Sequence, residues 1–258
     1  MRHDMKVRLA KSLEEVRVAQ QLRYCVFYEE GGALHRGEEG FDADRFDDVS
    51  EHLLVIEPFS DVPSPFALDD GVLVGTYRMI IQERAQSIGG FYSAAEFDLQ
   101  PLLQRHPNLR FLELGRSCVL KSARGTAVIE LLWQGIWNFV RIHKIDVMLG
   151  CASFDGTDPS NHKVALSFLA QKIQTPDEWR VKALPERFHD MNLVSETCYD
   201  AKRVLAGLPP LIKGYLRLGC CFGEGCVIDP GFNTVDVLVV LPVSAINPRY
   251  FARFGAPA

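Results

Sequence analysis

Short runs of apolar residues alternate along the chain with longer segments in which apolar residues recur every three or four positions. The short runs predict buried strands, and the longer segments predict amphipathic helices. The predicted strands are residues 7–10, 52–57, 72–81, 112–119, 146–154 and 235–242, and WRVKAL (179–184) is a weaker candidate. The strand at 72–81 is expected to pair antiparallel with 52–57 through a long connection.

Capping residues mark where the predicted helices begin. Ser12 and Glu15 form a capping box before a helix, and a second helix follows the turn KSARGTA and runs to about His143. The first helix is expected to bury Leu13, Val16, Ala19, Arg23, Val26 and Phe27, and the second Ile129, Leu132, Ile136 and Val140. Further helices are predicted after the caps Asp98, Asp158 (with Pro159) and Ser195, the last ending near Gly207, and at PPLIKGYLRLG.

The strand at 112–119, the helix to His143 and the strand at 146–154 form a predicted βαβ unit. With the predicted antiparallel hairpin, this unit predicts an α/β fold with a mixed β-sheet flanked by helices. Glu113 and Arg116 stand inside the first strand of this unit, LELGRSCV. A buried charge costs several kcal/mol unless it is paired or used, so these two residues are candidate functional residues.

Polar residues gather at four places near the edges of apolar elements: Arg23 with Phe27, Asp44 with Asp47, Arg78, and Glu113 with Arg116. Each group taken alone is most simply a structural ion pair. Together the pattern RxxxF, DxFD, a strand arginine and ExxR resembles the acyl-homoserine-lactone synthases, members of the GCN5-related N-acyltransferase superfamily. The resemblance implies that fold, in which the mixed sheet is splayed. It also implies a substrate site that contains Arg23, Phe27, Asp44, Asp47 and Arg78. The aromatic residue that the family carries after RxxxF is absent from the loop YEEGGALHRG.

A longer set of segments, from about residue 7 to residue 254, resembles the bacterial L-ornithine Nα-acyltransferases. The segments are LELGRSCVL, LLWQGI, GCASFDGTDP, PPLIKGYLRLG and FNTVDVLVVLP. The resemblance implies transfer of a 3-hydroxyacyl group from acyl carrier protein to the α-amine of L-ornithine, which gives lyso-ornithine lipid. Acyl carrier protein and L-ornithine are therefore the expected partners, and the acyl donor is expected to be carried on phosphopantetheine.

Aminolysis of a thioester requires a neutral amine, and Glu113 is the candidate general base, acting directly or through a water. Arg116 either holds the carboxylate of the amino acid or pairs with Asp47 to fix the loop over the site. Backbone N–H groups at a distorted strand around Ser117, Cys118 and Val119 are the candidate donors to the oxyanion. A thioester is already activated, so no metal or redox cofactor is expected.

The turn KSARGTA retains Arg124 and Gly125 but is poor in glycine. In the superfamily this turn usually cradles the pyrophosphate of coenzyme A with glycines and backbone amides, so the departure favours a carrier protein, whose phosphopantetheine brings one phosphate. Lys121 and Arg124 are expected to attract an acidic carrier protein. For Lys121 alone, a solvated basic turn is an equally good interpretation.

Several assignments stay open at the level of sequence. Cys118 and Cys151 are alternative nucleophiles, although cysteine in apolar strands is most often a small hydrophobe. Asp44 or Asp47 either receives the δ-ammonium of ornithine or pairs with arginines, and Asp155 is a further candidate, whereas Asp158 is better explained as a cap. The alternative functions are a lactone synthase, an acyltransferase for another amino acid such as lysine or glutamine, and a non-catalytic module that binds acyl carrier protein. A buried Glu113 beside the other clusters argues against such a module.

The composition indicates in which kind of protein and in which compartment this chemistry takes place. The chain has 258 residues, 47% hydrophobic and 24% charged, with a formal net charge of -5, which argues against broad nucleic-acid binding. A single domain over residues 1–258 is expected. The charged start MRHDMKVRLAKS and the polar residues in the most apolar helix predict no signal peptide and no membrane span. Seven cysteines, three of them in CCFGEGC without zinc-site spacing, predict reduced thiols in a cytoplasmic protein. The lipid product that the resemblance implies adds peripheral contact with the inner membrane as a further expectation.

Overall fold

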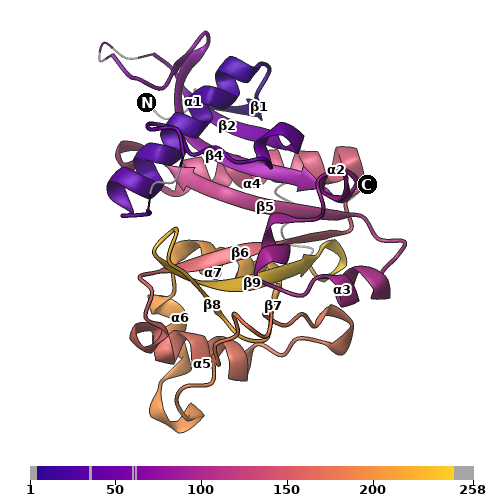
Figure 1. Cartoon of the computed structure of the whole chain (residues 1–258). Helices are drawn as coiled ribbons and strands as arrows, with labels where there is room; N and C mark the ends of the chain where they lie inside the picture. The colour runs from indigo at the N-terminus through magenta and orange to yellow at the C-terminus, as the bar shows by residue number, and fades with distance from the viewer. Residues whose placement is uncertain (1–4, 35–36, 60, 62, 247–258) are drawn as a thin grey trace.

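The computed structural model describes residues 5–34, 37–59, 61 and 63–246 (Figure 1). The first four residues of the charged amino terminus and the end of the resemblance, residues 247–254, lie outside the described residues. The structure has the mixed α/β architecture that the sequence predicts, with one sheet in the order β1-β2-β4-β5-β6-β9-β7. Strand β3 pairs with β4, and β8 pairs with β9.

The strands of this sheet are antiparallel to their neighbours except for β5 and β6, which are parallel as the βαβ unit requires. All six main predicted strands are confirmed. The strands are β1 (Lys6–Leu9), β2 (Glu51–Glu57), β3 (Ala67–Leu68), β4 (Gly71–Ile81), β5 (Phe111–Val119), β6 (Val147–Asp155), β7 (Cys221–Phe222), β8 (Val227–Asp229) and β9 (Thr234–Pro242).

Helices cover both faces of the sheet (Figure 1). Because side chains alternate along a strand, Leu54 and Ile56 pack against α1 on one face, whereas Leu53 and Val55 pack with α4 on the other. In the C-terminal half, α5 and α7 share the core of α4, and α2 and α3 cover the opposite face. The helices are α1 (Leu13–Tyr24), α2 (Gln82–Ser87), α3 (Gln100–Arg105), α4 (Thr126–His143), α5 (Lys163–Lys172), α6 (Ala201–Gly207) and α7 (Pro210–Leu218).

Capping was predicted well at two helices and less well at others. Ser12 accepts a hydrogen bond from the N–H of Glu15, and Asp158 caps a short 3-10 turn before α5. Asp98 was predicted wrongly as a cap, because Leu99 occupies the N-cap position of α3 with no side-chain hydrogen bond. Ser195 caps only the 3-10 turn Glu196–Cys198, and α6 has its own cap, Asp200.

Three other expectations were wrong. Residues 179–184 form no strand, because Lys182 and Ala183 make only isolated bridges to Glu224 and Phe97. Leu13, in the first turn of α1, is exposed, since the core lies against later turns of the helix. Ile129, near the start of α4, is also exposed.

The sheet opens in its centre. Strands β5 and β6 are each nine residues long, but they pair only through Phe111–Glu113 and Val147–Leu149. At the point of separation Gly150 has φ +157°, and a Cβ built there would lie 2.1 Å from the carbonyl oxygen of Leu114, so a side chain has no room. The edge of β5 that faces β6 is therefore left without a strand partner beyond Glu113.

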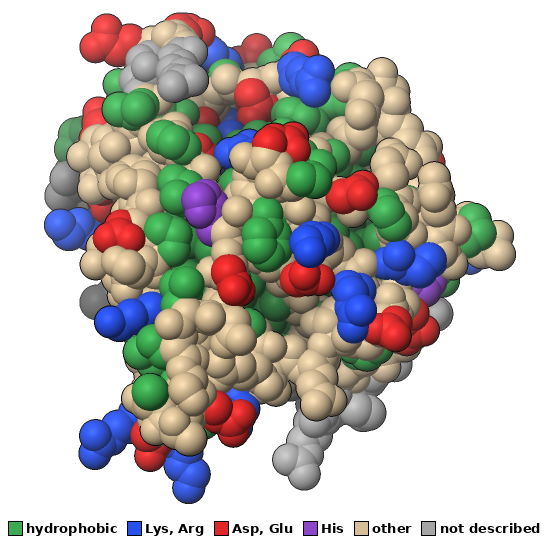
Figure 2. Space-filling view, turned by 60° about the horizontal axis from the view of Figure 1, so that its bottom comes forward, with side chains coloured by type: hydrophobic (Ala, Val, Ile, Leu, Met, Phe, Trp, Pro, Cys, Tyr) green, Lys and Arg blue, Asp and Glu red, His purple; other side chains and the backbone are tan. Residues whose placement is uncertain are grey.

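On the surface, positive and negative side chains are mixed. The face in Figure 2 shows Lys and Arg side chains interspersed with Asp and Glu. Among the described residues, none of the helices has the length and apolar character needed to cross a membrane.

Candidate active site

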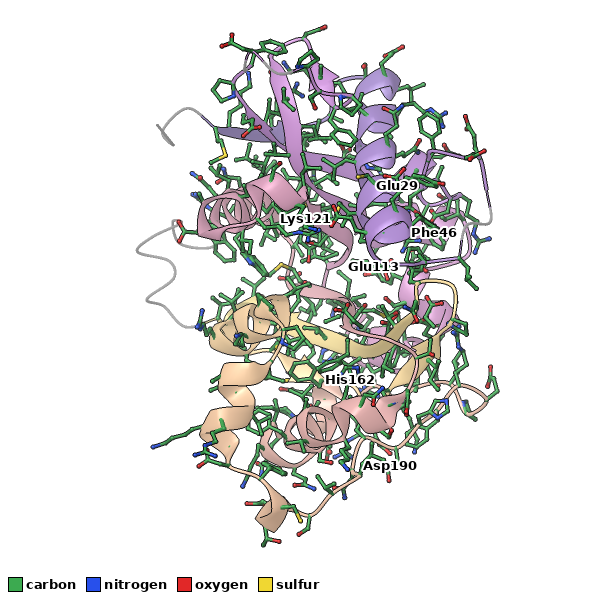
Figure 3. The ribbon with its side chains drawn as sticks, turned by 90° about the vertical axis from the view of Figure 1, so that its left-hand side faces the viewer. Glu29, Phe46, Glu113, Lys121, His162 and Asp190 are labelled. Carbon is green, nitrogen blue, oxygen red and sulfur yellow. The ribbon has the colours of Figure 1, made fainter. Side chains whose placement is uncertain are left out.

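A cavity of about 690 Å³ occupies the opening between β5 and β6. Of the predicted site residues, Phe27, Arg78, Glu113, Arg116, Ser117 and Arg124 line it. Figure 3 shows Glu113 between the N-terminal and C-terminal halves of the chain. Arg23, Asp44, Asp47, Cys118, Val119 and Gly125 lie outside its lining. The structure thus gathers half of the predicted residues around one cavity and places three of the other six, Arg23, Asp44 and Asp47, in its supporting wall.

The supporting wall begins with Arg23 on the last turn of α1. Its guanidinium lies 2.8 Å from Asp42 and 2.9 Å from Asp47, and all three side chains are buried. Burial alone would raise the pKa of Asp47, but Arg23 and Arg78 lower it below its ordinary value. Sequence reasoning missed Asp42, whose only signal was its place in the acidic loop.

Arg78 and Arg116 complete this wall. Arg78 lies 2.7 Å from Asp44, and Arg116 donates to Asp42 and Asp44, each at 3.1 Å. The predicted pairing of Arg116 with Asp47 is wrong: Arg116 pairs with Asp42 and Asp44, while Asp47 accepts hydrogen bonds from Arg23 and from the backbone N–H of Asp44. We name the alternating set Arg23, Arg78, Arg116, Asp42, Asp44 and Asp47 the arginine–aspartate network.

A bulge in β5 decides where Arg116 points. Arg116 has φ +51°, and the β4–β5 register shifts so that Arg116 and Ser117 together face Tyr77. In a regular strand Glu113 and Arg116 would lie on opposite faces, since side chains alternate. With the bulge, both contact Tyr92: its N–H donates to Glu113, and its ring lies 4.6 Å below the Arg116 guanidinium.

Aromatic rings fix this part of the site. The guanidinium of Arg116 also lies 4.3 Å from the ring centre of Phe232, which packs edge-on against Phe27 at 5.8 Å. Phe27 belongs to a π-helical segment, Cys25–Glu30, that continues α1. Such widened turns occur often at functional sites. Phe27 is thereby aimed at the cavity, as its predicted role requires.

Glu113 is held by backbone donors. Its two oxygens accept hydrogen bonds from the N–H groups of Tyr92 and Ser93, each at 2.7 Å, and the side chain is buried. Burial raises the pKa of Glu113, while the Ser93 hydroxyl and the two N–H groups act in the opposite direction. A carboxylate has about four lone-pair sites and these three donors use three of them, so Glu113 keeps capacity for one further partner.

The distortion predicted around Ser117–Val119 begins at Arg116, one residue earlier. Alternate residues of β5 direct their N–H and C=O groups away from β4, toward the opening. Cys118, by contrast, packs into the core beneath α1, and burial raises its pKa. Burial likewise raises the pKa of Cys151, whose sulfur donates to Glu96. These environments favour thiols over nucleophilic thiolates.

The turn before α4 combines a paired and an unpaired cation. Arg124 lies 2.5 Å from Glu30 and also donates to the carbonyl of Val119. Lys121 is exposed, and among the described residues it has no ion pair. Gly125 is the N-cap of α4 and provides no side chain to bind the first-turn N–H groups.

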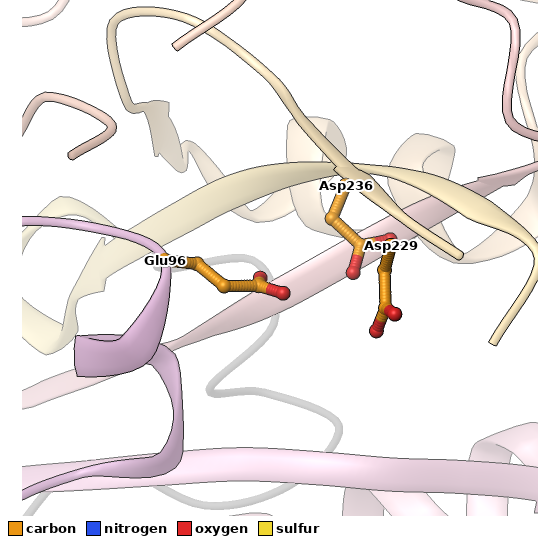
Figure 4. A group of neighbouring side chains, drawn as sticks. All are labelled: Glu96, Asp229 and Asp236. Carbon is orange, nitrogen blue, oxygen red and sulfur yellow. The ribbon is translucent and has the colours of Figure 1, made fainter. Parts of the chain in front are cut away.

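Three carboxylates that sequence reasoning missed lie together at the cavity: Asp229 and Asp236 line it, and Glu96 lies beside them outside the lining. Asp229 ends β8, Asp236 lies on β9, and Glu96 follows a 3-10 turn; one oxygen of each lies within 4.8 Å of the others (Figure 4). Burial, followed by the charge of Asp236, raises the pKa of Glu96 to about 7, and burial raises that of Asp236 to about 6. Among the described residues this is the group that could surround a cation.

A protein-family model described as an acetyltransferase (GNAT) domain matches residues 22–134. The structure is similar to FeeM, an N-acyl amino acid synthase from uncultured soil microbes, with a TM-score of 0.53, 12% identity and coverage of 96% of this chain and 97% of that chain. It is also similar to the AHL synthase LasI, with a TM-score of 0.51, 13% identity and coverage of 98% and 96%. The fold is that of the GCN5-related N-acyltransferases.

Sequence comparison places the chain within that class. The L-ornithine N(alpha)-acyltransferase of Brucella abortus (strain 2308) is 47% identical over 98% of this chain and 90% of its own length. The proteins of that name from Agrobacterium fabrum and Rhodobacter capsulatus are 47% and 40% identical, over 98% and 95% of this chain and 86% and 92% of theirs. The chain belongs to the L-ornithine N(alpha)-acyltransferase family.

Proposed function

We propose that the protein transfers a 3-hydroxyacyl group from acyl carrier protein to the α-amine of L-ornithine, giving lyso-ornithine lipid. The observation that carries the proposal is the cavity between β5 and β6, which joins a buried carboxylate, an arginine and an unpaired strand edge. The names of the nearly full-length relatives indicate the acceptor.

In the proposed reaction, Glu113 removes a proton from the α-ammonium, directly or through a water. The amine nitrogen then attacks the thioester carbonyl carbon, the C–S bond breaks and the thiolate leaves. The nitrogen loses its second proton to solvent, which gives the amide, and solvent restores the acid that protonates the thiolate. Burial suits Glu113 to this role because a raised pKa makes a carboxylate a better base near neutral pH. Tyr77, a buried phenol 2.6 Å from Tyr215, lines the cavity and is our candidate for protonating the thiolate.

Arg116 is the proposed anchor for the carboxylate of the acceptor. Two of its N–H groups donate to Asp42 and Asp44, and a guanidinium has five. The network and the rings of Tyr92 and Phe232 hold the guanidinium in one orientation, so its remaining donors are directed at the cavity. The contacts of Asp44 and Asp47 with arginines support the interpretation that these aspartates build the wall.

The donor is proposed to enter along the open edge of β5. Its amide-containing pantetheine arm matches the unpaired strand edge, and its single phosphate matches the uncapped N-terminus of α4. We therefore expect acyl carrier protein to be a much better donor than coenzyme A. Rates that favour acyl coenzyme A at equal concentration would overturn this part of the proposal.

The acceptor is tested by incubating purified protein with a 3-hydroxyacyl carrier thioester and ornithine, lysine, glutamine or norleucine. Mass spectrometry identifies the products, and fragmentation separates acylation of the α-amine from that of the δ-amine. We expect Nα-acyl-ornithine as the main product. Formation of a homoserine lactone from S-adenosylmethionine, or no acylated amino acid at all, would contradict the proposal.

The basic turn is tested by charge reversal at Arg124. Arg124→Glu places an acidic side chain beside Glu30 and should raise the Michaelis constant for the carrier and reduce its sensitivity to salt. Lys144→Glu, at the opposite end of α4, is the control with the same change in net charge. Equal salt responses of the two variants would show that Arg124 takes no part in docking.

A further inference from the structure

The three carboxylates at the cavity, which we name the acidic trio, come from separate parts of the chain. Glu96 follows the turn that holds Glu113, whereas Asp229 and Asp236 are brought together by the β8–β9 hairpin. Figure 4 shows the three side chains gathered in one place. Like charges this close repel one another, so a protein without a use for them gains nothing from the arrangement.

Each member of the trio is oriented by its own contacts. The first oxygen of Asp229 accepts N–H groups from Gly231 and Phe232, at 2.7 and 3.3 Å. Glu96 accepts from the sulfur of Cys151 at 3.3 Å. These bonds fix the direction of the two carboxylates. Asp229 lines the cavity together with Asp236, and Glu96 completes the group from outside the lining.

Asp236 supplies an independent observation. Its side chain is more than nine-tenths buried and lines the cavity, yet its Oδ1 has no hydrogen-bond partner among the described residues. Leaving a buried acceptor unpaired is costly, so this oxygen indicates a donor that arrives with a ligand. Compensating charge is scarce among the described residues. Arg187 lies 3.6 Å from Glu96. Burial raises the pKa of Asp236, and the hydroxyls of Ser153 and Thr234 and the charge of Arg116 only partly oppose it.

We propose that the acidic trio binds the side-chain ammonium of the amino acid acceptor and so selects a cationic side chain. The inference rests on the proposed function and adds the residues that recognise the side chain of the acceptor. An ammonium presents three N–H donors in tetrahedral directions, and acceptors about 2.8 Å from one such nitrogen lie about 4.6 Å apart. The trio oxygens lie no more than 4.8 Å from one another, so a single nitrogen can be within hydrogen-bond distance of all three.

The same cavity can then hold the acceptor at both ends. Arg116 anchors the carboxylate near Glu113, and the trio receives the δ-ammonium, so the α-amine lies beside the candidate base and the δ-amine is kept protonated. A charged δ-ammonium cannot attack a thioester, because it has no lone pair. The trio would therefore prevent acylation at the wrong nitrogen as well as select the substrate.

A divalent cation is the rival occupant of a group of carboxylates. Ca²⁺ takes six to eight oxygens, and Mg²⁺ requires near-octahedral geometry. One oxygen of Asp229 already accepts a backbone N–H, and one oxygen of Glu96 accepts the thiol of Cys151. The trio therefore has too few free oxygens to match such a coordination shell. Asp155, which also lines the cavity but is exposed, is the rival receptor for the ammonium.

The test compares L-ornithine with L-norleucine, in which a methyl group replaces the ammonium, using one acyl carrier thioester. In Asp236→Asn and in Glu96→Gln we expect the ratio of kcat/KM for ornithine to that for norleucine to fall about ten- to a hundred-fold, the effect of one charged hydrogen bond. Glu224→Gln removes an exposed carboxylate outside this cavity and is the matched control, with an unchanged ratio. Asp155→Asn should change the ratio less than the trio variants.

Each result is decisive for one of the ideas. If the wild-type protein acylates ornithine but the trio variants keep its preference, the inference is wrong and the proposed function stands. If no amino acid is acylated by the wild type, the proposed function itself fails. Loss of wild-type activity in EDTA that is restored by Mg²⁺ or Ca²⁺ would assign the trio to a metal. Calorimetric binding of ornithine, but not norleucine, to the folded variants at wild-type affinity would also overturn the inference.

Discussion

Replacing Glu113 by glutamine tests the proposed base, but the contacts of Glu113 show that this substitution does two things at once. Its oxygens accept the N–H groups of Tyr92 and Ser93, each at 2.7 Å. A glutamine amide turns one acceptor into a donor, which then faces another donor. We expect Glu113→Gln to lower the free energy of unfolding by about 1.5–3 kcal/mol through the lost charged hydrogen bond, in addition to a loss of turnover of about 10²–10⁴-fold.

Ser93→Ala separates the chemical effect from the structural one. The Ser93 hydroxyl lowers the pKa of Glu113, and its removal leaves both backbone N–H donors in place. The pKa of Glu113 should then rise, by about one unit for a hydrogen bond worth about 1.4 kcal/mol. If Glu113 is the base, the acid limb of the pH profile of kcat/KM moves upward by the same amount, with little change in the urea midpoint.

The assay is the initial rate of acylation of ornithine between pH 5 and 9, with unfolding in urea followed in parallel. The reasoning would be refuted by an acid limb that stays in place in Ser93→Ala while stability is retained. Near-wild-type turnover of Glu113→Gln at neutral pH would refute it independently. Recovery of Glu113→Gln activity at high pH would support a base role, because the free amine is then supplied by the solvent.

Three further predictions follow from buried groups. Asp42→Asn leaves two buried arginines short of a partner and should lower the free energy of unfolding by about 3–5 kcal/mol, so a urea titration giving less than 1 kcal/mol would contradict the network. Cys118→Ala should keep turnover within about two-fold, since burial raises the pKa of this thiol, and an acyl adduct on Cys118 found by mass spectrometry would show otherwise. The raised pKa values of Glu96 (about 7) and Asp236 (about 6) mean that the ligand-free fold binds more protons than the unfolded chain, so these groups lower stability as pH rises from about 4 to 7. His52, with a pKa lowered to about 4, acts in the opposite sense, so the measurement is the difference between wild type and Asp236→Asn, which should grow in favour of the variant across that range.

The strands and the longest helix could be predicted because their signals are local. Apolar runs bounded by turns fix β2, β4, β5, β6 and β9, and the helical period from Thr126 to His143 fixes α4. The weak elements failed for a related reason. Residues 179–184 have a strand-like pattern but no neighbouring edge to pair with, and pairing depends on the whole fold.

The candidate site was predictable only in part. Charged residues inside apolar strands flagged Glu113 and Arg116, and Asp236 in TVDVLVVLP carries the same signal, which went unused. Tyr92 and Ser93 could not have been found in this way, because they act through backbone N–H groups that any residue has. The sequence also could not predict which aspartate pairs with which arginine, because the pairing depends on how a long acidic loop folds over α1.

The arginine–aspartate network also limits how this protein can evolve. Its three arginines and three aspartates balance in charge, and most of them are buried. A single neutral replacement leaves an odd charge inside the protein, whereas exchanging an arginine and an aspartate together for apolar residues does not. Drift at these positions must therefore proceed through costly intermediates or by paired changes, so the six residues are expected to be inherited as a block.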